Sequence, residues 1–142
     1  MQVIVRTNAL DGIKESEKEI YQSTLISLRR DKIQTHLPSY RYEKETGGIS
    51  LNGITIQTDR ESRSILTGAY IRAKEDNTYT VRWKTADGFV TLNAGQIIAI
   101  SDAVAAHVQK CYAAEADVAA DILSFTSVAE VEAAFDQSYL IQ

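Results

Sequence analysis

Two short apolar segments joined by Asn52-Gly53 most constrain the fold of this 142-residue chain. Residues 49–51 and 54–56 alternate apolar and polar side chains, as β-strands do. An Asn-Gly pair between such strands favours a type I′ turn, which requires positive φ at both central residues. This register predicts a hairpin whose four apolar side chains share one face, with Leu51 opposite Ile54 and Ile49 opposite Ile56.

A long stretch without Pro or Gly, rich in helix-forming residues, precedes the hairpin and predicts a helix over residues 13–35. Pro38 is expected to end this helix, because proline lacks the amide hydrogen and restricts the residue before it. A helix that is apolar on two sides usually contacts two neighbours, and another subunit is a candidate for one of them. The apolar residues of this helix fall on two such faces, Tyr21, Leu25 and Leu28 on one and Ile26 and Ile33 on the other.

After the hairpin, residues 58–61 form a sequence typical of a capping box, with Thr58 at the N-cap and Glu61 reaching back to it. Gly68 lies inside the helix that follows and costs about 1 kcal/mol relative to alanine, so we expect a closely approaching neighbour beside it. The apolar positions recur at helical spacing, at Ile65, Leu66, Ala69, Tyr70 and Ala73.

A second hairpin is predicted over residues 79–92, with its turn at 85–88. Val81 and Trp83 alternate with polar residues, which is typical of a half-buried strand. This hairpin is followed by another predicted helix.

That last major helix is predicted over residues 93–125, with Asn93 and Gln96 as a capping box and Leu92 and Ile97 as a hydrophobic staple. Its apolar stripe drifts as a seven-residue repeat does. The helix is longer than four short strands can cover, so another helix or another chain is expected on its distal half. The stripe consists of Ile97, Ile100, Val104, Val108, Cys111, Val118, Ile122 and Phe125.

At the two ends of the chain the sequence patterns that predict secondary structure are weaker. Residues 2–6 predict a short edge strand and residues 8–12 a turn. A capping box at residues 127–130 predicts a short helix through Phe135, followed by a tail over residues 136–142 that ends in the apolar pair Leu140-Ile141. We therefore predict an α+β fold: an N-terminal helix, then two β-hairpins each followed by a helix (ββα-ββα), with a long C-terminal helix. The predicted divisions are residues 1–44 for attachment or oligomerisation, 45–126 for the ββαββα domain, and 127–142 for the short helix and tail.

Composition excludes several classes of function. The formal net charge of −4 argues against a nucleic-acid partner, since phosphate contacts require a basic surface. No stretch approaches the roughly 20 apolar residues of a membrane span, and the N-terminus does not resemble a secretory signal. Cys111 is the only cysteine, so no intrachain disulfide forms and a reducing compartment is expected.

The sequence offers few candidates for chemistry. His107 and Cys111 lie one helical turn apart, but two ligands do not make a zinc site, and Cys111 lies on the apolar stripe, so structural packing is expected. Asp117 and Asp121 face away from the stripe, towards solvent. Residues 40–42, Tyr-Arg-Tyr, could form a recognition patch, although such a patch is more often simple surface. No cofactor or metal site is predicted.

Glu115 is the more informative acid, because it lies in the middle of the apolar stripe. An unpaired buried carboxylate is costly. Glu115 is therefore expected to be exposed where the helix leaves the core, or to pair with a base such as Arg63 or Arg72. Catalysis is the third interpretation.

Five motifs, in order, resemble a domain of unknown function that recurs in tail-fibre and tail-associated genes of tailed bacteriophages and prophages. They are GGISLNGI at 47–54, TDRES at 58–62, LTGA at 66–69, VRWKTADG at 81–88 and AVAAHVQKC at 103–111. The resemblance covers roughly residues 45–125, and the segments before it and after Ser127 lie outside. It implies a role in the virion or its assembly and carries over no catalytic residues. In that family the domain typically follows a helical segment, as residues 13–35 would provide.

The leading hypothesis is a structural tail protein, an adaptor linked to a tail fibre or baseplate, assembled in the host cytoplasm and working by protein–protein interaction. It is expected to be a homo-oligomer, a trimer around helices by analogy with tail fibres, with other tail proteins as partners and neither nucleic acid nor membrane. The alternative is a fibre-assembly chaperone that is absent from the finished virion. An enzyme is not expected, since a glycan-degrading site would need two converging carboxylates. The candidate interface residues are Tyr21, Leu25, Leu28, Ile26, Ile33, Glu115, Val118, Ile122, Leu140 and Ile141.

Overall fold

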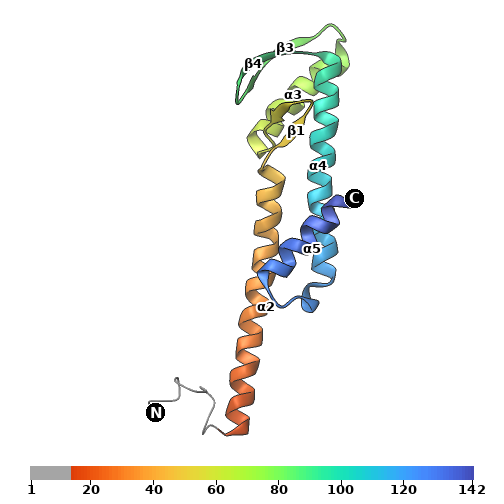
Figure 1. The fold of residues 1–142 in the computed structure, drawn as a ribbon. Coiled ribbons are helices and arrows are strands. Elements are labelled where there is room, and N and C mark those ends of the chain that lie inside the picture. Colours follow the sequence, from red (N-terminus) through yellow and green to blue (C-terminus); the bar gives the residue numbers. More distant parts are fainter. Residues whose placement is uncertain (1–13) are drawn as a thin grey trace.

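The computed structural model describes residues 14–142, and these form an elongated α+β fold in which two long helices carry the other elements (Figure 1). The predicted strand at 2–6 and turn at 8–12 lie outside the described residues. The element order follows the prediction in outline, with two small antiparallel sheets of two strands each. The elements are α2 (Glu15–Thr46), β1 (Ile49–Leu51), β2 (Ile54–Ile56), α3 (Arg60–Glu75), β3 (Thr80–Thr85), β4 (Gly88–Asn93), α4 (Ala94–Ala120), the 3₁₀ helix η1 (Ile122–Ser124) and α5 (Val128–Leu140).

Helix α2 continues through Pro38, so the prediction that proline ends this helix is wrong. Interior proline costs about 3 kcal/mol in a helix. Here Pro38 lies on the exposed side, where water can solvate the carbonyl group of Gln34 that loses its amide partner. Its neighbours Leu37 and Tyr40 are buried in the core, and each stabilises the helix by roughly 1.5–3 kcal/mol through burial. Tertiary packing on both sides of the proline therefore outweighs the local penalty.

The first hairpin has the predicted register, with Ile49 opposite Ile56 and Leu51 opposite Ile54. Asn52 and Gly53 have φ values of 52° and 79°, the left-handed conformation that a type I′ turn requires. The prediction of this hairpin is confirmed.

The start of α3 differs by one residue from the prediction. Asp59, not Thr58, is the N-cap, and its carboxylate accepts a hydrogen bond from the Ser62 amide at 3.0 Å. Thr58 is buried instead, where its hydroxyl accepts from the Gly48 amide and donates to the Glu45 carbonyl at 2.7 Å. A threonine hydroxyl can cap a helix or bond to other nearby backbone groups. Here Thr58 is buried in the β2–α3 connection and takes the second role.

Strands β3 and β4 pair from Thr80 opposite Asn93 to Thr85 opposite Gly88, so the second hairpin is close to its prediction. The predicted capping box of Asn93 and Gln96 is present at the start of α4. Helix α4 ends at Ala120, however, and not at residue 125, and η1 follows it.

Helix α5 extends to Leu140, so the predicted tail over residues 136–142 is wrong for most of its length. Ser127 caps the helix as predicted, through the Glu130 amide. The extra turns persist because Ser138 is buried and Tyr139 packs against the core, contacts that no local signal encodes.

The core consists of two clusters that share α4. The first lies between α3, the two hairpins and the N-terminal half of α4; its buried members are Ile56, Leu66, Ala69, Ala73, Leu92, Ala94, Ile97, Ile100 and Val104. The second lies between α2, α5 and the C-terminal half of α4, with Ile33, Leu37, Tyr40, Cys111, Ala114, Val118, Val131 and Phe135 buried. Helices α2 and α5 thus cover the distal half of α4, as expected for a stripe too long for the strands (Figure 1). The predicted divisions fall inside α2 and just before α5.

In the described part of the chain, no atom lies within 4 Å of the position that a Cβ of Gly68 would occupy, so the predicted close neighbour is not found there. The residue is exposed on α3. No described residue explains the glycine at this position.

Gly68→Ala is therefore expected to raise the free energy of unfolding by about 0.5–1 kcal/mol, because alanine lowers the backbone entropy lost in a helix without a steric cost. Chemical denaturation of the two proteins measures the change. Gly48→Ala is the control: Gly48 has φ of +90° and its Cβ would lie 3.1 Å from the Ile56 carbonyl oxygen, so this variant should be destabilised. A destabilised Gly68→Ala variant would contradict the assignment of open space around that residue.

Candidate functional site

The most unusual polar group of the structure is Glu45, a carboxylate with 0% exposure at the end of α2. Three arginines surround it. Arg41, one turn earlier, donates to Oε1, while Arg63 and Arg60 of α3 approach Oε2 at 2.8 and 3.5 Å. Burial alone raises the pKa of Glu45, but the contacts with Arg63, Arg41 and Arg60 outweigh it and hold the pKa below its ordinary value. Glu45 is therefore charged at neutral pH and joins α2 to α3.

The same network reaches α4 through Arg41, whose Nε donates to Glu115 at 3.0 Å. The Arg41 guanidinium also lies over the Tyr112 ring, 4.7 Å from its centroid. Glu115 is thus held in an ion pair between helices, with Arg41 as its base and not Arg63 or Arg72. Sequence reasoning could not find Arg41, because its 74-residue separation from Glu115 gives no local signal.

His107 forms a second polar link between helices. Its Nε2 lies 2.9 Å from the Lys44 carbonyl oxygen, and its Nδ1 lies 2.8 Å from the Tyr139 hydroxyl. A carbonyl only accepts, so Nε2–H of His107 donates to Lys44, and Nδ1 pairs with the Tyr139 hydroxyl. His107 therefore ties α4 to the ends of α2 and α5.

Cys111 lies one turn from His107, with its Sγ 3.8 Å from Nε2. Burial, followed by the charge of Glu45, raises the pKa of the Cys111 thiol to about 11. The thiol is protonated at neutral pH and packs in the second core cluster. Within residues 14–142, no group of three or more His, Cys, Asp and Glu side chains is placed to hold a metal ion, and no helix is both long and apolar enough to cross a membrane.

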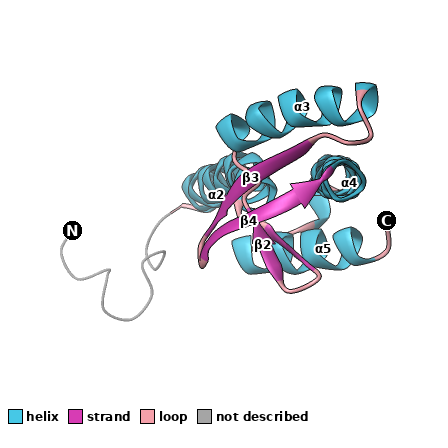
Figure 2. Ribbon diagram, turned by 90° about the horizontal axis from the view of Figure 1, so that it is seen from above, coloured by secondary structure: helices cyan, strands magenta, loops and turns pink. Residues whose placement is uncertain are grey.

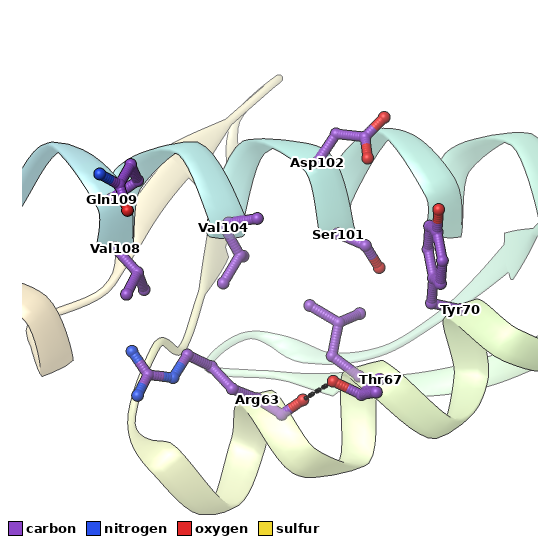
Figure 3. Close-up of a pocket in the computed structure, with 10 residues that line it drawn as sticks. Arg63, Thr67, Tyr70, Ser101, Asp102, Val104, Val108 and Gln109 are labelled. Carbon is purple, nitrogen blue, oxygen red and sulfur yellow. Dashed lines mark hydrogen bonds between the residues drawn. The ribbon is translucent and has the colours of Figure 1, made fainter. Parts of the chain in front are cut away.

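A groove of about 470 Å³ lies between α3 and α4 (Figure 3). Leu66, Val104 and Val108 form its apolar wall, and Tyr70 closes one end. Two buried polar atoms at its edge, Nη1 of Arg63 and Oγ of Ser101, have no hydrogen-bond partner among residues 14–142. A second hollow of about 780 Å³ lies between the end of α2, the first hairpin and α5, and His107 and Tyr139 line it.

The predicted interface residues divide into three groups. Ile33 and Val118 face inward and belong to the second core cluster, so in this conformation they contact other parts of the same chain. Ile122 packs partly against that cluster, and Glu115 is held by Arg41. The others are exposed, namely Tyr21, Leu25, Ile26, Leu28, Leu140 and Ile141, together with Ile20, which the sequence analysis did not single out.

The residues Tyr40, Arg41 and Tyr42 do not form one patch. Tyr40 is buried and donates to the Asp136 carboxylate of α5 at 2.9 Å. Arg41 joins the Glu45 network, and only Tyr42 is exposed, beneath the guanidinium of Arg60. Consecutive residues of a helix point in different directions, and α2 includes these three residues because it continues past Pro38.

Glu45→Gln is expected to lower the free energy of unfolding at neutral pH by about 2–4 kcal/mol, since it leaves buried arginine charges without their partner. Urea denaturation measures the loss, with the exposed Glu43→Gln as a matched control that should change little. Because the folded-state pKa of Glu45 lies below its ordinary value of about 4.3, its contribution is present above that pH and disappears as the pH falls through the folded-state value. The difference in the free energy of unfolding between wild type and variant should therefore narrow as the pH falls below the ordinary pKa of glutamate. A difference that is independent of pH would contradict a charged Glu45.

Comparison with known proteins found no match among curated proteins and none among solved structures. One family matches over residues 28–139, which extends beyond the resemblance at 45–125 at both ends. The match includes every buried residue of both core clusters, and it leaves the first part of α2 outside. The chain therefore belongs to the family described as a domain of unknown function, DUF4376.

Proposed function

We propose that this chain is a structural component of a bacteriophage tail, an adaptor linked to a tail fibre or baseplate that acts by binding other proteins. The resemblance of residues 45–125 to a domain that recurs in tail-fibre genes supports the link to phage, and the family itself has no assigned function. The observation that carries the proposal is the exposed N-terminal part of α2.

The segment of α2 from residue 15 to residue 32 has no buried residue. It projects beyond α4 and α5 in Figure 1. An isolated helix of this length is marginal in water, so a helix that projects in this way gains stability from a partner. Five large apolar side chains are exposed on it, at Ile20, Tyr21, Leu25, Ile26 and Leu28.

Three of these residues have the spacing of a helix–helix seam. Tyr21, Leu25 and Leu28 are separated by four and three residues, as successive core positions of a coiled coil are. At ~100° per residue they lie roughly 80–140° around the helix axis from Ile33, whose side chain packs in the second core cluster. Copies of this segment can therefore associate without covering the two core clusters of the region that matches the family, residues 28–139. We propose a homo-oligomer, and a trimer in particular, because tail fibres are commonly trimeric.

The rest of the molecule would then contact other tail proteins. The exposed apolar pair Leu140 and Ile141 at the end of α5 is one candidate contact. In this proposal the chain is assembled in the host cytoplasm, remains in the virion tail, and uses no cofactor, nucleic acid or membrane. Its polar clusters serve to hold helices together, which favours an interaction protein over an enzyme.

The variant with both Leu25→Glu and Leu28→Glu is expected to be monomeric, because repeated carboxylates across the seam repel one another and lose the apolar contact. Light scattering coupled to size-exclusion chromatography measures the molar mass, which should fall to one third of the wild-type value. Ser23→Glu with Ser27→Glu is the matched control, since it adds the same charges away from the seam and should leave the oligomer intact. Wild-type protein that is monomeric at high concentration would contradict the proposal.

Quantitative mass spectrometry of purified virions of the phage or prophage that encodes the chain tests the tail role itself. The structural role predicts the protein at a fixed copy number relative to a known tail protein. Its absence from particles, together with its presence in the lysate that produced them, would favour the fibre-assembly chaperone.

A further inference from the structure

A hollow of about 620 Å³ lies along β3, at the end of the molecule opposite the projecting part of α2. Five consecutive residues of β3, from Val81 to Thr85, line it. Successive side chains of a strand point to opposite faces, so a hollow that touches all five must run along the strand's edge. On its other side the hollow is lined by Gln57, Ser62 and Ile65, at and just before the start of α3.

Within residues 14–142, that edge of β3 has no pairing strand. Among the described residues β3 pairs only with β4, and the other small sheet is separate. Seen from above, β3 lies on the α3 side of its hairpin and β4 on the far side (Figure 2). The free edge therefore faces α3 across the hollow and presents unpaired backbone groups, which is the arrangement used for strand addition.

The side chains around this edge are apolar and basic. Ile65 is 60% exposed and Phe89 is 69% exposed, and both line the hollow. Arg82 and Lys84 project from the exposed face of β3, with Lys84 opposite Phe89. Neither β3 nor β4 contains an acidic residue, and the ion pairs within residues 14–142 involve neither of these cations.

The positive charges of Arg82 and Lys84 distinguish between the possible binding partners of this edge. A second copy pairing through β3 would bring Arg82 and Lys84 of one chain close to the same cations of the other, and like charges across a strand pair are destabilising. Two cations on a chain of net charge −4 do not provide the basic surface of a nucleic-acid site. A segment of another protein that carries carboxylates between apolar residues complements both the charge and the exposed apolar side chains.

We propose that the free edge of β3 binds an extended segment of a neighbouring protein by strand addition, and that acidic residues alternate with apolar ones in this segment. The segment's backbone pairs with β3, its carboxylates lie beside Arg82 and Lys84 on the exposed face, and its apolar side chains point to the other face and cover Ile65. This inference rests on the proposed adaptor function, for which it names the chemistry of the second partner. The oligomer seam and the binding edge then lie at opposite ends of the molecule (Figure 1).

Two fluorescein-labelled synthetic peptides test the inference on the full-length chain by fluorescence anisotropy. In the first, Glu alternates with Ile and Val, and in the second each Glu is replaced by Lys. The dissociation constant of the acidic peptide is expected to be at least about tenfold lower than that of the basic one, because its charge complements that of the edge. Hydrogen exchange should show added protection of backbone amides within β3 when the acidic peptide is bound.

Matched variants locate the site. The double variant R82E/K84E is expected to reverse the preference between the peptides, while R72E/K74E makes the same charge change on exposed residues of α3 and should preserve it. Ile65→Ser should weaken binding about tenfold through lost apolar contact, and Ile71→Ser, also exposed on α3, should not.

The inference is overturned if the two peptides bind alike, if neither binds, or if β3 amides gain no protection. It is also overturned if the two double variants behave alike. These outcomes are distinguishable from failure of the proposed function, because light scattering on the same wild-type sample reports the α2 oligomer independently of the peptides.

Discussion

The buried charge of Glu45 constrains how the helices of this protein can be arranged. A carboxylate removed from water is stable only where fixed donors or cations lie against it. Here Arg41 of α2 donates to Oε1, and Arg63 of α3 forms an ion pair with Oε2 at 2.8 Å. The backbone of the same residue accepts a hydrogen bond from Thr58, which fixes the connection into α3. The end of α2, the first hairpin and the start of α3 are therefore held in one relative position, next to α4.

Helix α4 extends this arrangement along both core clusters. Its N-terminal half packs with the hairpins and α3, and its C-terminal half packs with α2 and α5, so one helix serves two core clusters. Ion pairs and hydrogen bonds, such as Arg41 with Glu115 and His107 with Tyr139, connect the faces where the helices meet. The extent of the family match agrees with this packing, since it begins at residue 28, shortly before the first buried residue of α2.

Most ionisable side chains that are removed from water serve this packing. The thiol of Cys111 has a raised pKa, and burial followed by the Asp136 hydrogen bond raises the pKa of Tyr40 above its ordinary value. Groups held in their neutral form by burial and internal bonding are poor nucleophiles or bases at neutral pH. Among the described residues, the projecting part of α2, the grooves and the edge of β3 are open surfaces. These surfaces support the proposal that the chain binds other proteins.

Local interactions explain what could be predicted. The Asn52-Gly53 turn, the register of the first hairpin and the caps at Asn93 and Ser127 depend on residues within a few positions of one another. The conformational preference of each short segment is therefore sufficient to specify them. The family resemblance was likewise carried by such local motifs, which is why it covered the hairpins and missed the ends of the matched region.

The sequence by itself determined the α+β class, the two hairpins and the chain order of most elements. The spacing of apolar residues, the turn residues and the helix caps all act over short distances along the chain. Only the tertiary structure decided that α2 passes through Pro38, that α5 reaches Leu140, and that Glu45 is the buried acid. In each case the deciding energy comes from partners far away in the chain. Leu37 and Tyr40 pack in the cluster that α5 completes, Tyr139 is hydrogen-bonded to His107, and Glu45 forms an ion pair with Arg63. The periodicity of one segment does not specify which distant side chain will lie against it.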